Sequence, residues 1–388
     1  MEINSYLDKM KNIHKRILEF IEKEGNSEKD YQIMIDFLNN LKPKLNRNEL
    51  KELLHLITKI SNNHHRNPYF FDKIERILTF YKIEMKKNFT NQEIYDIFKS
   101  NKRLIYSLIK SRIITPYKRI GQSMTKAKRS SSSYLYFFYP ETDPFYHKKL
   151  KQKIEWEKGK VEELNKLIKY NPQIFEEKRK IGENDAEICQ LIRNDSLDEF
   201  IMYINDRKVP LSSVIKPSIF ETNLFLIKNK PTLIEYAAFF GSIQIFNYLI
   251  ENNVKLTSSL WIYAIHSQNI QFIHLLEENK IQPEDDSYLK CFVEALKCHH
   301  NELADYLKTK YLNGKLPEDF NLFEKSIPYY NFAFFNDKFD DQAIFYNLCR
   351  YDYITLVIFL LKSKNFNVNE KVGIQNFINL IQFQLFFL

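Results

Sequence analysis

The 388-residue chain is 44% hydrophobic and 15% aromatic, so it can bury sizeable cores and is not expected to be disordered. Seven glycines and twelve prolines are few for this length, which argues against an all-β sandwich or barrel, because such folds need a turn at every hairpin. The 57 Lys and Arg against 49 Asp and Glu give a formal net charge of +8. This mild basic bias neither requires nor excludes a nucleic-acid partner.

The first 112 residues carry apolar side chains at helical spacing, which predicts an N-terminal helical domain over residues 1–112. In residues 3–21 the buried face is expected to consist of Leu7, Met10, Ile17 and Ile21. Thr90 and Glu93 have the spacing of a capping box, in which each side chain satisfies a backbone donor of the other residue, so a helix should begin directly after Thr90.

Residues 113–150 change in composition and predict a connector rich in Pro, Ser and basic residues. The basic run at 118–129 suggests nuclear import or polyanion binding, although a solvated loop is the interpretation we favour for so short a cluster. The aromatic run at 134–139 is either an exposed patch or a segment that docks the connector onto the rest of the chain, and we favour docking.

Internal similarity in the second half predicts a series of helix–turn–helix repeats over residues 151–370. Three pairs of residues are each 27 positions apart, namely Ala237 and Ala264, Ile243 and Ile270, and Leu249 and Leu276. In such a unit a small residue lets two short helices approach, a glycine turns the chain, and an apolar stripe faces the next unit. Weaker copies lie near residues 191–203, 295–307 and 348–369.

The copy at residues 231–249 resembles an ankyrin repeat. Residues 232–238 occupy the place of the Thr-Pro-Leu-His-x-Ala signature of that family, and Gly241 occupies the place of its glycine turn. The resemblance implies an all-α fold: an α-solenoid of ankyrin-like repeats preceded by an N-terminal helical domain.

Four further stretches resemble large protist families in which an uncharacterised helical domain precedes degenerate ankyrin repeats. These stretches are residues 54–66, 97–103, 180–185 and 217–223. The resemblance implies a non-catalytic scaffold that binds protein partners, and it leaves partner identity and oligomeric state open. Binding of nucleic acid or another polyanion through the basic connector is the alternative hypothesis.

The repeat register suggests which side chains contact a partner. We expect the inner-helix positions to face a concave surface, and the loop positions to lie near the tips of the repeats. The eight candidates are Phe239, Phe240, Asn252, Asn253, His266, Ser267, Lys280 and Gln282.

Histidines and cysteines are the side chains that invite a catalytic or metal-binding interpretation. Cys291 and Cys298 are seven positions apart, whereas zinc fingers usually pair ligands two to four residues apart, so we expect buried thiols beside an exposed His299–His300 pair. We interpret His64 and His65 as polar residues at a helix end, and Ser218 to Glu221 as a capping box. Phosphate-loop and nucleophile-elbow motifs do not occur. We therefore predict no enzyme activity, no cofactor and no metal.

The four cysteines, Cys189, Cys291, Cys298 and Cys349, lie far apart, and the first residues of the chain are charged. This pattern predicts reduced thiols in an intracellular and cytoplasmic protein. The basic run leaves a nuclear location open. Residues 371–388 form an apolar tail that contains several Asn and Gln residues. Because its apolar part is shorter than the roughly 20 residues that a transmembrane helix needs, we expect no membrane span.

Overall fold

The computed structural model describes residues 3–117, 120–121, 134, 136–141, 164, 166–284, 288–318, 320–336 and 342–363. Within these residues every regular element is a helix, and the one bridge of β type joins Val214 and Thr232. The predicted all-α fold is therefore confirmed for this part of the chain. Most of the basic run at 118–129 and the whole tail at 371–388 lie outside the described residues.

The chain divides into two units. The first contains residues 1–60, 67–74 and 292–388, and the second contains residues 61–66 and 75–291. This division does not follow the boundaries near residues 112 and 150 that the composition suggests, and those boundaries stay predictions.

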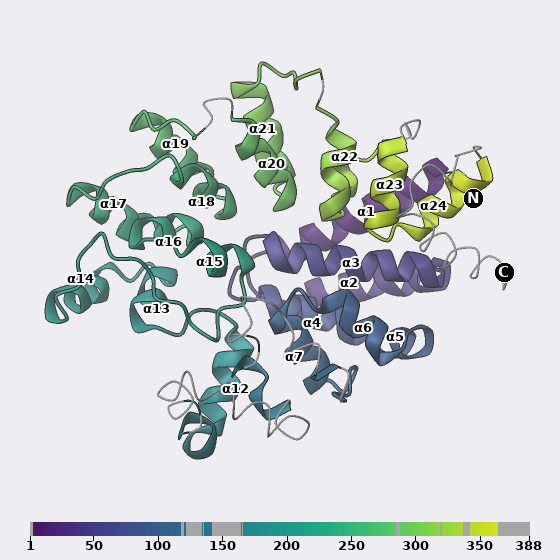
Figure 1. Ribbon diagram of the computed structural model, residues 1–388, viewed down its shortest axis with the longest axis horizontal. Helices are drawn as coiled ribbons and strands as arrows, with labels where there is room; N and C mark the ends of the chain where they lie inside the picture. Colours follow the sequence, from purple (N-terminus) through teal and green to yellow (C-terminus); the bar gives the residue numbers. More distant parts are fainter. Residues whose placement is uncertain are drawn as a thin grey trace. The chain divides into compact units, whose positions relative to one another are not determined.

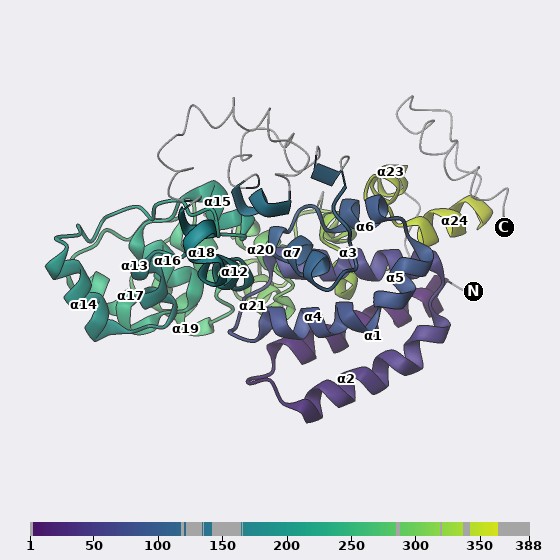
Figure 2. The same ribbon diagram turned by 90° about the horizontal axis from the view of Figure 1, so that it is seen from below.

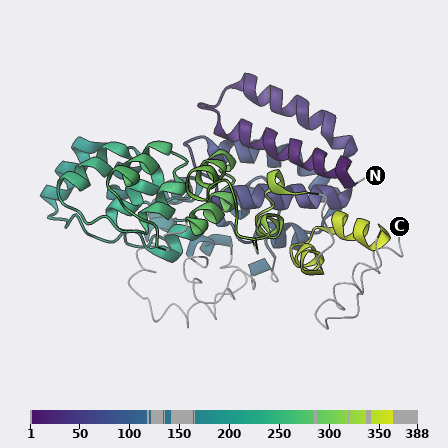
Figure 3. The ribbon, with the colours of Figure 1, turned by 90° about the horizontal axis from the view of Figure 1, so that it is seen from above.

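The first unit combines the N-terminal helices with the last helices that the structure describes. Its elements are α1 (Ile3–Glu22), α2 (Glu28–Leu41), η1 (Lys42–Lys44), most of α3 (Arg47–Asn63), the start of α4 (Phe70–Phe80), most of α20 (Leu289–Lys297), α21 (Asn301–Tyr311), α22 (Leu322–Ser326), η3 (Ile327–Tyr329), η4 (Phe332–Phe334), α23 (Gln342–Arg350) and α24 (Ile354–Ser363). Helix α1 lies beside α2, as Figures 2 and 3 show, and also packs on η4. Met10, Ile17 and Ile21 are fully buried on its predicted face.

A buried carboxylate joins three helices of the first unit. Glu52 of α3 accepts a hydrogen bond from the hydroxyl of Tyr6 on α1. Its other oxygen accepts the backbone N–H of Thr355 in the first turn of α24, at 2.9 Å. Asp352, in the turn before α24, forms an ion pair with Lys51 of α3 and lies 3.4 Å from Nε2 of His55, whose pKa is lowered by burial. The hairpin of α23 and α24 is therefore held to α3 by charged side chains as well as by apolar packing.

The second unit consists of short helices, several of which have the caps that the sequence suggests. They are α5 (Lys82–Asn88), α6 (Asn91–Phe98), α7 (Lys102–Lys110), α12 (Pro172–Ile181), α13 (Glu187–Arg193), α14 (Leu197–Asp206), α15 (Leu224–Asn229), α16 (Leu233–Phe240), α17 (Ile243–Glu251), α18 (Leu260–His266) and α19 (Ile270–Glu278). The capping box of Thr90 and Glu93 is confirmed at the start of α6, and a second one, of Thr232 and Glu235, begins α16.

Three helix pairs follow one another in the second unit (Figure 1). They are α13 with α14, α16 with α17, and α18 with α19. The first helices of the pairs pack in succession, α13 on α16 and α16 on α18, and the second helix α14 packs on α17. The chain thus repeats one supersecondary unit and stacks it on itself.

The 27-residue period recurs in the backbone conformation. Asn253 follows α17 and Lys280 follows α19, and both residues have left-handed backbone angles, with φ of 60° and 56°. The residue after each donates to a carbonyl of the preceding helix, Val254 to Leu249 at 3.0 Å and Ile281 to Leu276 at 2.9 Å. This is the Schellman helix end, in which a left-handed residue lets orphan carbonyls find donors.

The three pairs of anchor residues differ in their burial. Ala237, Ala264, Leu249 and Leu276 are all core residues. By contrast, Ile270 is 39% exposed, and Ile243 is only partly buried. The period is therefore carried by the small residue of the first helix and by the leucine of the second, whereas the isoleucine anchors begin the second helix near solvent.

Candidate functional site

The eight predicted partner-binding residues differ in exposure. Asn252, Asn253, Lys280 and Gln282 are exposed, Phe240 is partly buried, and Phe239, His266 and Ser267 are buried. Packing occupies the three buried side chains, so a direct contact between them and a partner would require this part of the second unit to rearrange.

Ring stacking explains why the inner-helix positions are not open. The rings of Phe239 and His266 stack with centroids 4.9 Å apart, and the ring of Phe225 lies 4.2 Å from that of His266. Ser267 donates its hydroxyl to the carbonyl of Ala264 at 2.7 Å, which closes the turn after α18. The repeat register correctly makes these positions equivalent, but equivalent positions on stacked helices also pack against each other.

A pocket of about 310 Å³ opens beside these rings. Its walls come from both ends of α15, the first turn of α16, the start of α18, the loop before α20 and the first turn of α20, and they include Phe225, Glu235, Ser258, Ile262, Glu284 and Lys290. All of these elements begin or end at the pocket, so it lies on the side of the repeats where the loops are. This volume is in the range of small-ligand pockets.

Glu235 is held in place at the pocket wall. Its carboxylate accepts the backbone N–H of Thr232 at 2.8 Å and the hydroxyl of Ser259 at 2.6 Å. The residue thereby caps α16 and also links the start of that helix to the start of α18. Burial, together with this carboxylate, raises the pKa of Tyr263.

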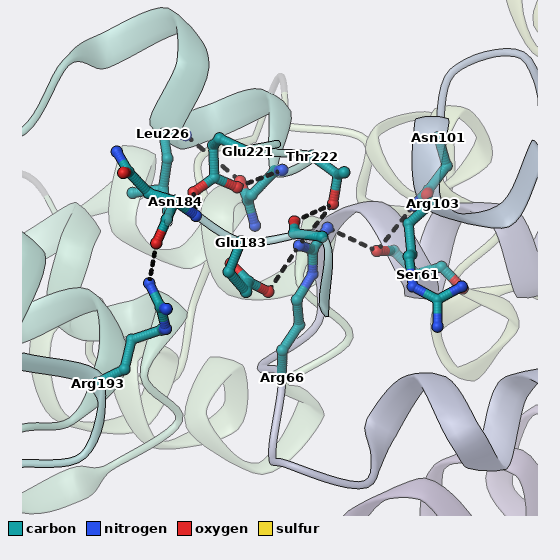
Figure 4. Close-up of polar contacts among 12 residues, drawn as sticks. Ser61, Arg66, Asn101, Arg103, Glu183, Asn184, Arg193, Glu221, Thr222 and Leu226 are labelled. Carbon is teal, nitrogen blue, oxygen red and sulfur yellow. Dashed lines mark hydrogen bonds and ion pairs between the residues drawn. The ribbon is translucent and has the colours of Figure 1, made fainter. Parts of the chain in front are cut away.

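A second feature of the second unit is a buried junction of charged side chains (Figure 4). Arg66 donates to a carboxylate oxygen of Glu183 at 3.0 Å and to the hydroxyl oxygen of Thr222 at 3.1 Å. It also donates to the carbonyl of Ser61 at 3.3 Å. Arg66 is only 9% exposed, so one guanidinium ties together the end of α3, the turn after α12 and the loop before α15.

Glu221 is the second carboxylate of this junction. Its two oxygens accept the backbone N–H groups of Asn184 at 3.2 Å and Asn223 at 2.7 Å. Burial, and next the negative charge of Glu183, raise its pKa to about 7. Arg193 donates to the carbonyl of Asn184 at 2.8 Å, which brings a further positive charge to the junction.

Lys102 and Asn101 complete the junction from the start of α7. Lys102 is 2% exposed and donates to the carbonyl of Ile219 at 3.0 Å, and burial lowers its pKa to about 7. Asn101 donates to the carbonyl of Ser61 at 3.2 Å and caps α7 by accepting from the N–H of Leu104.

Gly182 is required by the close approach of chain segments at the junction. Its φ is +73°, and a Cβ there would lie 3.0 Å from Cδ of Arg103. Its carbonyl accepts two hydrogen bonds from Thr222, one from the backbone N–H at 3.0 Å and one from the hydroxyl at 2.7 Å. A side chain at this position would strain the backbone and push on a buried arginine.

The junction unites the four stretches that carry the wider family resemblance. Residues 54–66 contribute Arg66, residues 97–103 contribute Lys102, residues 180–185 contribute Glu183, and residues 217–223 contribute Glu221. Nothing in the spacing of these charged residues along the chain predicts that they meet. In the structure Arg66 bonds Glu183, whereas Lys102 and Glu221 bond backbone groups.

Two local predictions are wrong. Ser218 and Glu221 do not form a capping box, because no helix begins there; the hydroxyl of Ser218 donates to Asp185 at 2.6 Å instead. His299 and His300 are not exposed, since each is only 1% exposed, and His299 shares a 2.9 Å hydrogen bond with His14 inside the first unit. The prediction that Cys291 and Cys298 are buried thiols, by contrast, is confirmed, and Cys189 and Cys349 are buried as well.

Comparison with known proteins finds no match among family models, curated proteins or solved structures. The ankyrin resemblance and the wider family resemblance thus remain predictions. None of the described helices is both long and apolar enough to cross a lipid bilayer.

Proposed function

We propose that this protein is a non-catalytic scaffold whose helix pairs form a short ankyrin-like solenoid that binds a protein partner. Stacked helix pairs of this kind present an extended surface built from many equivalent positions. The support comes from the three consecutive pairs of the second unit, which share their order of packing and their left-handed helix ends.

The observation that carries the proposal is the equivalence of the loop tips after α17 and α19. Asn253 and Lys280 are 27 positions apart, have the same backbone conformation and are both exposed. A repeated, rigidly held and exposed tip is suited to contact a partner, because its backbone is ordered before binding and little conformational entropy is lost.

The test is affinity purification of the full chain followed by mass spectrometry, with Asn253→Arg and Lys280→Glu combined in one variant. We expect the variant to lose partners that the wild type retains. Lys87→Glu is the matched control, because Lys87 is an exposed lysine of the second unit that lies at the end of α5 and belongs to none of the three helix pairs. Retention of every specific partner by the double variant would place the binding surface elsewhere.

A further inference from the structure

The pocket beside α18 is rich in hydrogen-bond acceptors. The carboxylates of Glu235 and Glu284 and the hydroxyl oxygen of Ser258 lie in its lining. Asn229 also lines the pocket, and because its Nδ2 donates to the carbonyl of Phe225 at 3.0 Å, its Oδ1 is left as an acceptor. Serine hydroxyls accept as well as donate, so every polar group named here accepts hydrogen bonds.

Lys290 is the one cation among the described residues that line the pocket. Its ammonium lies 3.4 Å from Glu284, and the two side chains are 62% and 79% exposed. An ion pair so open to water contributes little free energy and is easily exchanged. The carboxylate of Glu284 is consequently accessible to a competing cation.

Apolar side chains form another part of the pocket lining. Phe225 and Ile262 are partly buried and Pro283 is buried, so together they form a surface on which an aliphatic chain can lie. A lining that combines several acceptors with apolar surface matches a side chain with an alkyl stem and a cationic head.

We propose that this pocket binds an arginine side chain of the protein partner. A guanidinium carries five N–H donors in a planar fork and no acceptor, which complements a lining that contains several carboxylate and hydroxyl acceptors. The ammonium of a lysine offers three donors around one point and can reach fewer of these acceptors at once. This inference rests on the proposed function, since it names the chemistry by which that partner is recognised.

The test uses fluorescence anisotropy with the full-length protein and synthetic peptides that differ at one position. The probes are dye-labelled acetyl-Gly-Ser-Leu-X-Ser-Gly amides in which X is arginine, lysine or citrulline. Citrulline keeps the shape of arginine but is uncharged. We expect the arginine peptide to bind at least about 10-fold more tightly than the citrulline peptide, because citrulline cannot form charge-assisted hydrogen bonds with the carboxylates of the pocket.

Three protein variants separate the pocket from general charge effects. Glu284→Gln should weaken arginine-peptide binding at least about 5-fold, and Lys290→Gln should strengthen it, because it removes the competing cation. Glu251→Gln is the matched control: Glu251 is exposed at the end of α17, does not line the pocket, and its substitution changes the net charge as Glu284→Gln does. It should leave binding unchanged.

Three results would each overturn the proposed arginine pocket. They are equal binding of the arginine and citrulline peptides, equal effects of Glu284→Gln and Glu251→Gln, and no binding of any peptide at 1 mM. The proposed scaffold function fails on a different result, namely when affinity purification finds no partner that depends on the loop tips. A partner that depends on Asn253 and Lys280 but binds Glu284→Gln equally well would leave the scaffold proposal in place and remove only the pocket.

Discussion

At the scale of single residues, Arg66 shows how much one buried cation holds together. Its guanidinium bonds Glu183, Thr222 and the carbonyl of Ser61, and its surroundings also include the second buried carboxylate, Glu221. Burying charges costs free energy unless they are paired, so removing this cation leaves Glu183 without its ion-pair partner and Glu221 with less positive charge nearby. The stability of the junction therefore depends on charge balance more than on the number of its hydrogen bonds.

We predict that Arg66→Gln lowers the free energy of unfolding by about 3–5 kcal/mol, as is typical when one partner of a buried ion pair is removed. Urea unfolding of the full chain measures the change. Arg207→Gln is the control, because Arg207 pairs with Glu187 at 3.0 Å while both side chains are about 60% exposed. Its loss should cost less than about 1 kcal/mol. Similar losses in the two variants would show that the Arg66 contacts are not effectively buried.

The pKa of Glu221 predicts a pH dependence with a definite sign. Burial and the charge of Glu183 raise this pKa from 4.5 in the unfolded chain to about 7 in the folded protein, so the folded state binds the proton more tightly. The contribution of Glu221 to stability is thus fully present below pH 4.5 and is lost as the pH rises through 7.

Comparison of the wild type with Glu221→Gln measures this effect. The unfolding free energy of the wild type, relative to the variant, should fall between pH 4.5 and 7.5. Lys102→Met provides a contrast of opposite sign. Burial lowers the pKa of Lys102 from 10.5 to about 7, so the contribution of Lys102 to stability is lost as the pH falls from 10.5 to 7. Parallel pH profiles of the wild type and Glu221→Gln would contradict the raised pKa.

At the scale of the elements, the left-handed turns are what allow short helices to stack. Gly241 joins α16 to α17 with φ of 79°, and Lys208 follows α14 with φ of 50°. Residues with a Cβ pay a steric penalty in this conformation, whereas glycine does not. The repeat tolerates non-glycine residues at most of these turns because the Schellman hydrogen bonds compensate for the strain.

We predict that Gly241→Ala destabilises the fold by about 1–2 kcal/mol through backbone strain alone. The new Cβ would have its nearest neighbour, Cβ of Ser267, at an ordinary contact distance of 3.8 Å, so no clash contributes. Thermal and urea unfolding check the value. Lys208→Ala should change stability by less than about 0.5 kcal/mol, because it leaves an L-residue in the same conformation. An unchanged free energy of unfolding in Gly241→Ala would mean that the backbone of the turn relaxes to accommodate the side chain.

Much of the structure of the individual helices and turns could be predicted from the sequence. The helix over residues 3–21, the capping box of Thr90 and Glu93, and the 27-residue period all appear in the structure. Each depends on residues within a few positions of one another, or on their repetition. The predicted capping box at Ser218 is wrong because Ser218 bonds Asp185, which lies 33 positions away along the chain. A local sequence pattern carries no information about such a distant partner.

At the scale of the whole molecule, the division into two units was not predictable. The first unit takes residues 1–60 together with residues 292–388. Within that unit, Glu52 bonds the N–H of Thr355, 303 positions away along the chain. A change in composition, such as the one at residues 113–150, marks where a chain is rich in turns, but it does not show which segments pack together.

The sequence by itself determined the helical class, the helix starts and the repeat period, because hydrophobic spacing and capping act over one or two turns of helix. Only the tertiary structure decided that Phe239 and His266 are stacked rather than open, and that Arg66, Glu183 and Glu221 lie together. Burial and charge pairing depend on contacts between residues far apart in the chain, and a periodic pattern shows which face of a helix is apolar without showing what covers it.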